Sequence, residues 1–195
     1  MTADILIRPA DPDDSPAVAP LVVDAGGGIY EFLLDGVVPG LSVAELLVPG
    51  LAAREGSFSY RHCAVAVDGP SVIGVAHAYP ADWMKGVDRS FLPAERLEHI
   101  STFDAAQDWG SYFLSALAVE RAWRRRGVAA RLLDWVEGRA RTGGFDRITL
   151  HVWADNAPAR RLYARHGFIE VEAAAIPWHV RLPHEGGSLL LRKRL

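Results

Sequence analysis

The sequence has very little cysteine and no long apolar run. Cys63 is the single cysteine among 195 residues, so an intrachain disulfide is impossible and a cysteine-based zinc site is disfavoured. No apolar stretch approaches the roughly 18 residues that a membrane-spanning helix requires. The first fourteen residues carry acidic side chains where a signal peptide would carry basic ones. These absences predict a cytoplasmic protein that has no membrane partner.

Repeats and low-complexity tracts are also lacking, whereas apolar residues are plentiful. Hydrophobic residues make up 50% of the chain and charged residues 23%, an ordinary globular mixture that excludes disordered and collagen-like classes. Two domains within this length would each have a small core. We therefore expect residues 1–195 to form a single domain.

The net charge of −3 excludes a generally basic nucleic-acid binder, but the charge is unevenly distributed. Residues 1–110 hold 6 basic and 16 acidic side chains, whereas residues 111–195 hold 15 basic and 8 acidic. Fourteen of those 15 basic residues are arginine, which suits bidentate contacts with phosphate. An acidic half could attract a cationic partner. The alternative is uneven scatter over solvated faces, and charge alone does not decide between the two.

The order of the expected elements indicates an α/β protein, or α+β by some conventions, with a mixed sheet. Apolar alternation and turn signals predict strands at residues 5–8, 63–67, 72–79, 112–119, 147–153, 168–172 and 188–192. Helical periodicity predicts helices near residues 14–24, 42–54, 93–100, 127–141 and 157–165. The strand–helix–strand run from residue 112 onward implies a parallel strand pair joined by a right-handed crossover.

A basic loop between a strand and a helix forms a candidate anion site. Residues 117–133 run from a buried strand through Arg124, Arg125 and Arg126 into a helix whose apolar face repeats every three to four residues. The first amide protons of a helix are unpaired and carry partial positive charge, so they bind anions. Gly127 and Ala129 would let phosphate oxygens approach the main chain. The pattern is neither a Walker loop nor a dinucleotide fingerprint.

A second informative segment spans residues 156–168. Asn156 can cap the following helix, Pro158 suits its first turn, and Gly167 can end it. Ala159 and Tyr163 are four residues apart and therefore lie on one face of that helix. A lone tyrosine at such a position usually packs in a core.

Together the two segments resemble the GNAT superfamily of N-acetyltransferases. The hallmark [Arg/Gln]-x-x-Gly-x-[Gly/Ala] and the downstream Asn-x-x-Ala-x-x-x-Tyr-x-x-x-Gly-Phe stand here in the family's order, over residues 112–172. Arg125 stands where many members have glycine, and Arg121 where many have proline. The resemblance implies a central sheet of six to seven strands, flanked by helices, in which a splayed parallel strand pair holds acetyl-CoA.

The resemblance also implies roles for individual residues. The pyrophosphate of acetyl-CoA would lie on the loop and helix start, and the pantetheine arm along the preceding strand. A main-chain amide near Leu117 would polarise the thioester carbonyl, and Tyr163 would protonate the leaving thiolate. The residues expected to contact the cofactor are Leu117, Ala118, Val119, Arg124, Arg125, Arg126, Gly127, Val128, Ala129 and Asn156.

The acceptor side carries no comparable motif. Glu31 follows a glycine-rich bend and could bind an ammonium group; it is the substrate-binding candidate. The residues that could act as a base or hold a water molecule are Glu31, Tyr60, His77, Glu98 and Ser115. The tryptophans that could line a pocket are Trp83, Trp109, Trp153 and Trp178. His151 has no partner at metal-ligand spacing, and no metal is expected.

These observations predict acetyl transfer from acetyl-CoA to a primary amine of a small molecule, by direct attack in a ternary complex. One alternative is acetylation of a protein or peptide amino group. Another is a non-catalytic module that binds acyl-CoA. A nucleic-acid partner is not expected, because aromatic and basic residues do not interleave. A homodimer is possible.

Overall fold

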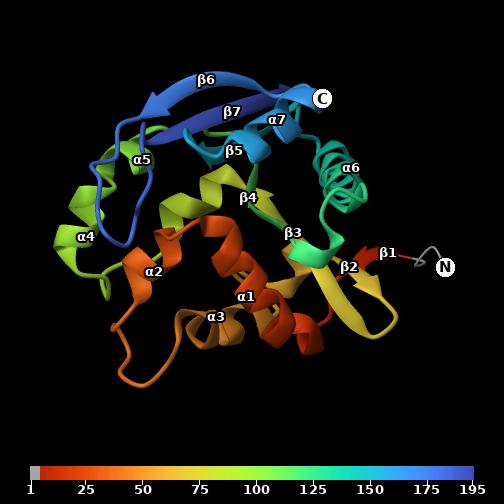
Figure 1. Ribbon diagram of the computed structural model, residues 1–195, viewed down its shortest axis with the longest axis horizontal. Helices are drawn as coiled ribbons and strands as arrows, with labels where there is room; N and C mark the ends of the chain where they lie inside the picture. The colour runs from red at the N-terminus through yellow and green to blue at the C-terminus, as the bar shows by residue number, and fades with distance from the viewer. Residues whose placement is uncertain (1–4) are drawn as a thin grey trace.

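The computed structural model describes residues 5–195, and residues 1–4, with which the expected domain begins, lie outside the described part. A seven-stranded mixed sheet runs through the molecule in the order β1-β2-β3-β4-β5-β7-β6 (Figure 1). The strands are β1 Leu6–Pro9, β2 Cys63–Asp68, β3 Ser71–Pro80, β4 Tyr112–Val119, β5 Arg147–Trp153, β6 Ile169–Ala174 and β7 Ser188–Arg194. The helices are α1 Ser15–Gly26, α2 Ile29–Leu34, α3 Val43–Ala52, α4 Ala94–His99, α5 Ser101–Ala105, α6 Val128–Thr142 and α7 Ala157–Arg165.

Helices cover both faces of the sheet because strand residues alternate between two apolar clusters. In β2, Ala64 and Ala66 pack in the cluster that contains α6. Val65 and Val67 point the other way, into the cluster formed with α1 and α3. The apolar stripe predicted for residues 127–141 is confirmed, since Val128, Leu132, Val136 and Ala140 of α6 are all buried.

The parallel pair expected from the sequence is confirmed, and it is joined over a very short length. β4 and β5 are in register only at Tyr112 with Ile148 and at Phe113 with Thr149. Beyond these pairs β4 remains paired with β3, whereas β5 is paired along its whole length with β7. A bulge in the β3–β4 ladder leaves Ser115 without a register partner, between Leu114 and Ala116. The two parallel strands therefore diverge toward their carboxyl ends.

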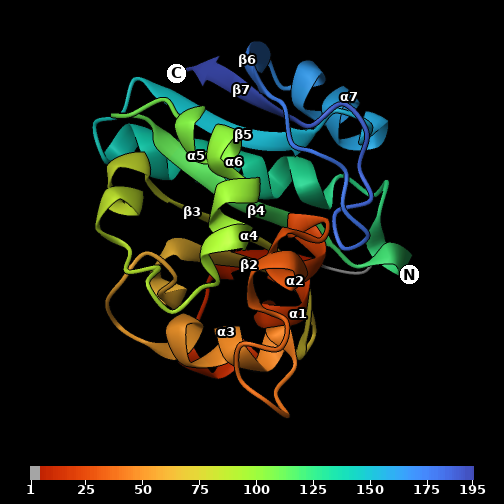
Figure 2. The same cartoon turned by 90° about the vertical axis from the view of Figure 1, so that its left-hand side faces the viewer.

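The segment between β6 and β7 folds back across the molecule to the junction of α1 and α2 (Figure 2). The ring of His184 stacks on that of Trp153, with centroids 4.2 Å apart, and its Nε2 lies 2.7 Å from the carbonyl oxygen of Gly27. Trp153 Nε1 donates to the carbonyl of Gly26. A Cβ on Gly28, at φ 100°, would lie 2.5 Å from the carbonyl oxygen of Arg181. Glycine is therefore required where these segments meet.

The structure also corrects parts of the expected pattern. The first helix begins at Ser15, after a short 3-10 turn at Pro12–Asp14, and extends to Gly26. The sixth strand begins one residue late and ends at Ala174. Helices α2 and α5, of six and five residues, were not expected. The mixed sheet flanked by helices is confirmed.

Candidate functional site

A cavity of about 910 Å³ occupies the opening between β4 and β5. It is bounded by the end of α1, the start of α6 and one side of α7. Its walls bring together most of the residues singled out in the sequence, from segments that are far apart along the chain. The lining residues among them are Ser115, Leu117, Ala118, Val119, Arg124, Arg125, Gly127, Val128, Ala129, His151, Trp153, Asn156 and Tyr163.

The first turn of α6 opens onto this cavity. Gly127 is its N-cap at φ 78°, a left-handed conformation that glycine adopts without strain. The first hydrogen bond of the helix runs from Arg131 N to Gly127 O, so the amides of Val128, Ala129 and Ala130 have no partner within the helix. These three residues line the cavity, and a Cβ at Gly127 would meet no atom within 4 Å. The arrangement suits an anionic group.

The three arginines of the loop are placed differently. Arg124 Nε donates to the carbonyl of Val119 at 2.8 Å, and its Nη2 lies 3.1 Å from Asp24 of α1. Arg125 lines the cavity and has a left-handed backbone at φ 61°. Arg126 lies over the ring of Trp123, 4.8 Å from its centroid, and is not among the described lining residues. Its contact with the cofactor stays a prediction.

The backbone of β4 presents hydrogen-bonding groups to the opening. Glu120 N donates to Ile73 O of β3. Backbone amides and carbonyls alternate in direction along a strand, so those of Glu120, Ala118 and Ala116 point toward β3. Those of Leu117 and Val119 point the other way, toward the opening left by β5. The carbonyl of Val119 accordingly accepts from Arg124 rather than from β3. The amide and carbonyl of Leu117 thus face the cavity.

Helix α7 contributes Tyr163 to the wall, and its N-cap residue Asn156 lies there too. The side chain of Asn156 accepts a hydrogen bond from Ala159 N at 3.2 Å, which confirms the predicted cap. Tyr163 is 8% exposed, and its ring packs edge-on against Phe168. Burial raises the pKa of the Tyr163 phenol, so this hydroxyl stays protonated across the working pH range.

The inner end of the cavity has apolar walls and a few uncharged hydroxyl groups. Phe103, Phe113 and Ile29 line it together with Ser115 and Ser188. Nothing in the sequence marked Phe103, Ile29 or Ser188, because they come from α5, α2 and β7, elements without a motif. Phe113 could have been found, since it lies two residues before Ser115 on the same strand.

His151 also lies at this end, between Ser188 Oγ at 3.0 Å and the carbonyl of Ala106 at 2.8 Å. Burial lowers its pKa to about 4, so the ring is neutral near pH 7. Both ring nitrogens already have partners within the chain, so we assign His151 a structural role in the cavity wall.

Other candidates lie elsewhere. Glu31 is in α2 and is not among the described lining residues, although its Oε2 is buried without a hydrogen-bond partner in the described part of the chain. Its role as a substrate-binding residue stays a prediction. Of the four tryptophans, Trp153 lines the cavity, Trp83 lines a separate groove, and Trp109 and Trp178 are exposed. Asp24 is the carboxylate of the described lining, and it is paired with Arg124.

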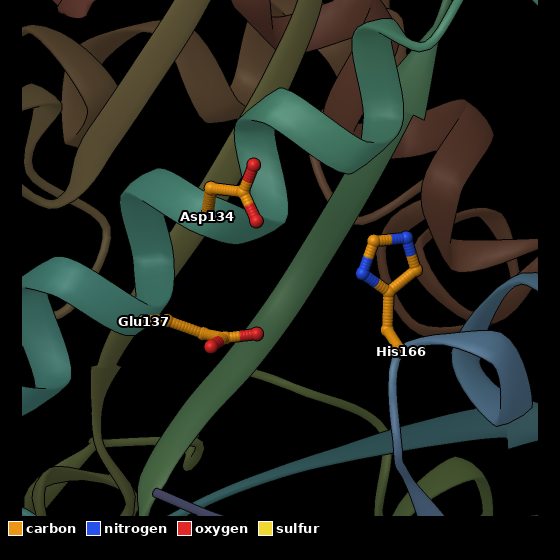
Figure 3. A group of neighbouring side chains, drawn as sticks. All are labelled: Asp134, Glu137 and His166. Carbon is orange, nitrogen blue, oxygen red and sulfur yellow. The ribbon is translucent and has the colours of Figure 1, made fainter.

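Within residues 5–195, one cluster has metal-ligand chemistry. Asp134 and Glu137 of α6 lie opposite the ring of His166, which follows α7, with ligand atoms within 4.8 Å of one another (Figure 3). Glu137 is paired with Lys193 through one oxygen and lies 3.5 Å from Arg141 through the other. These cations already balance the negative charge of Glu137, and we assign no metal site here.

Comparison with known proteins agrees with this geometry. The model of the acetyltransferase (GNAT) family matches residues 45–168, which include the β4–α6 loop and α7. The chain belongs to the acetyltransferase (GNAT) family. Among relatives, the chloroplastic GCN5-related N-acetyltransferase 4 of Arabidopsis thaliana is 27% identical over 88% of this chain and 63% of its own. The L-amino acid N-acetyltransferase AaaT of Escherichia coli is 36% identical over 33% of this chain and 40% of its own.

Solved structures share the GNAT fold over nearly the whole chain. A crystal structure of an acetyltransferase superimposes with a TM-score of 0.68 at 25% identity, covering 97% of this chain and 98% of the other. Drosophila melanogaster polyamine N-acetyltransferase gives 0.70 at 16% identity, covering 98% and 100%. The matches to the curated relatives, by contrast, cover between 21% and 63% of those proteins. None of the helices in residues 5–195 is long and apolar enough to cross a membrane.

Proposed function

We propose that this protein transfers the acetyl group of acetyl-CoA to a primary amine of a small molecule. The observation that carries the proposal is the cavity between the diverging strands, which joins an anion-binding helix start to an apolar inner end. In this proposal the amides of α6 and the Arg125 guanidinium hold the pyrophosphate. The backbone of β4 from Leu117 to Val119 pairs with the pantetheine arm like a partial strand.

The groups around the thioester have complementary chemistry. The amide of Leu117 faces the opening and can donate to the thioester carbonyl as it becomes an oxyanion. Tyr163 remains protonated and can give its proton to the departing thiolate. Across the reaction, the amine nitrogen loses one proton and the thiol sulfur gains one. We therefore expect direct attack in a ternary complex, with Asn156 contacting the cofactor.

A small acceptor is favoured over a protein or peptide because Ile29 of α2 and Phe103 of α5 form walls at the inner end. The segment before β7 is anchored beside it through His184, which stacks on the lining residue Trp153 and contacts Gly27. The inner end also offers aromatic and hydroxyl groups rather than carboxylates. A polyamine would bury a second charge without a partner there, so an amine with an apolar body fits better. Among solved structures, an agmatine N-acetyltransferase shares the fold at a TM-score of 0.68, 16% identity and coverage of 98% of this chain and 100% of the other. Its acceptor is a small amine but carries a second cation, so it supports the small acceptor and not the apolar body.

The test is thiol release from acetyl-CoA with a panel of arylalkylamines, polyamines, amino acids, aminoglycosides and peptides. We expect turnover with at least one small amine. We expect Tyr163→Phe to lower that turnover about a hundredfold, the low end for a lost general acid, while acetyl-CoA affinity changes little. Binding of acetyl-CoA without thiol release from any acceptor would instead indicate an acyl-CoA-binding module. Unchanged turnover in the Phe variant would remove Tyr163 from the mechanism.

A further inference from the structure

Ser115 occupies a special place on β4. It is the bulge residue, left without a register partner between His77–Ala116 and Ala78–Leu114. It lies two residues beyond Phe113, the last residue of β4 that pairs with β5. Its side chain lines the cavity at the point where the strands part. A bulge re-aims a side chain, and here it directs the hydroxyl to the inner end of the opening.

The hydroxyl of Ser115 is held by a buried histidine. Ser115 Oγ lies 2.6 Å from Nδ1 of His77, a fully buried residue of β3. His77 Nε2 lies 2.8 Å from the carbonyl oxygen of Ser57. A carbonyl can only accept, so Nε2 of the neutral ring carries the proton and Nδ1 offers a lone pair. Burial lowers the pKa of His77 to about 4, which keeps the ring in this neutral form near pH 7.

This arrangement fixes the direction of the Ser115 hydrogen bond. A serine hydroxyl has one proton and two lone pairs, and its proton is directed at His77, whose Nδ1 lies 2.6 Å and whose carbonyl oxygen lies 3.2 Å from Oγ. The oxygen therefore faces the cavity as an acceptor. Two residues further along β4, the amide of Leu117 faces the same opening as a donor. Two residues of extended strand span about 7 Å, room for a carbonyl group and an attacking nitrogen between the two groups.

We propose that Ser115, oriented by His77, accepts a hydrogen bond from the N–H of the attacking amine and aims its lone pair at the thioester carbon. This rests on the proposed acetyl transfer. Ser115 contacts the substrate, and His77 is a positioning residue. As the C–N bond forms and the C–S bond breaks, Tyr163 gives its proton to the sulfur, and the proton lost by nitrogen restores the phenol. His77 is neutral before and after the reaction.

The first test compares three serine variants with a small amine that the wild type acetylates. We expect Ser115→Ala to lower kcat/KM for the amine about tenfold while KM for acetyl-CoA is unchanged. Ser115→Thr, which keeps the hydroxyl, should restore activity to within about threefold of wild type. The control is Ser111→Ala, since Ser111 is a buried serine that bonds Thr149 Oγ1 at 2.6 Å where β4 and β5 are still paired. It should leave kcat/KM unchanged.

The second test separates orientation from folding through two variants of His77. In His77→Asn the amide oxygen can replace Nδ1 as the acceptor for Ser115. In His77→Gln the amide nitrogen can replace Nε2 as the donor to Ser57, and the Nδ1 acceptor is lost. We expect the Asn variant to retain most of the amine kcat/KM. The Gln variant should lose clearly more, up to the loss seen in Ser115→Ala, because only the longer hydrogen bond to the carbonyl oxygen of residue 77 remains. Acetyl-CoA-dependent increases in Tm establish that each variant is folded.

The outcomes distinguish this inference from the proposed function. Normal amine kcat/KM in Ser115→Ala, or an equal loss in Ser111→Ala, would overturn the role of Ser115 and leave acetyl transfer standing. A smaller loss in His77→Gln than in His77→Asn would overturn the positioning role of His77. A wild type that binds acetyl-CoA and acetylates no amine would overturn both the function and the inference.

Discussion

Arg125 shows at the scale of one residue how the family pattern and this chain differ. It is the non-glycine residue with a positive φ in the described part of the chain, at 61°, where many family members have glycine. A side chain in the left-handed region costs about 1–2 kcal/mol. The retained arginine adds a cation to the cavity wall beside the start of α6.

The strain and the charge of Arg125 can be separated with two variants. Arg125→Ala removes the charge and keeps the strained backbone, whereas Arg125→Gly removes both. We expect the Gly variant to be more stable than the Ala variant by about 1 kcal/mol in urea unfolding. Both should lose acetyl-CoA affinity equally, by several-fold, and the loss should shrink at high salt. A Gly variant that binds as tightly as wild type would show that the charge is not used.

At the scale of elements, the start of α6 is the feature that most sharply separates binding from folding. Gly127 and Gly144 flank this helix at φ 78° and 77°, and a Cβ added at either one would meet no atom within 4 Å. The two glycines therefore impose the same backbone strain when substituted. Only Gly127 lies on the cavity among the described lining residues.

We expect Gly127→Glu to abolish acetyl-CoA binding, because a carboxylate would lie where the pyrophosphate is expected. Gly144→Glu should lower the free energy of unfolding by a similar amount and leave binding intact. Calorimetric titration with acetyl-CoA and urea unfolding of both variants measure the two effects. Equal loss of binding in both would mean that strain, not charge at the helix start, is responsible.

Local signals account for the elements that the sequence predicted well. The strands Tyr112–Val119 and Arg147–Trp153 and the helix Ala157–Arg165 have the predicted bounds, since apolar alternation and caps are encoded within each segment. The same holds for the loop and helix start at residues 124–130, one continuous segment that we propose as the cofactor side. The proposed acceptor side is assembled differently. The Ser115–His77 contact joins residues 38 positions apart, and the His184–Gly27 contact joins residues 157 positions apart. Such contacts depend on strand register and loop path, which no local pattern encodes.

For the whole molecule, two buried neutral histidines link stability to pH. Burial lowers the pKa of His77 and of His151 to about 4, whereas an unfolded imidazole takes up its proton near pH 6.5. Below pH 6.5 the unfolded chain therefore binds more protons than the folded one. Stability should be complete above that pH and fall as the pH drops to 4, by on the order of 3 kcal/mol per histidine.

His151→Gln tests this dependence without touching the helix start. The variant should be less stable than wild type at pH 7.5, because ring packing against Phe103 is lost. Its free energy of unfolding should then decline less steeply between pH 6.5 and 4.5, since one of the two depressed imidazoles is gone. Urea unfolding across this range measures both curves. Parallel curves would show that His151 does not contribute to the acid sensitivity.

Because only two register pairs connect β4 with β5, the sheet consists of two halves that are weakly joined. Strands β1 to β4 form one half and β5, β7 and β6 the other, and the ladder connects them only at Tyr112 and Phe113. The two halves are joined at one end of the β4–β5 pair and separate toward the other. A pantetheine arm lying between them would supply the missing hydrogen bonds and connect the two halves. The coenzyme would then stabilise the fold as well as take part in the reaction. Backbone amides in both halves of the sheet should show slower hydrogen exchange once it is bound.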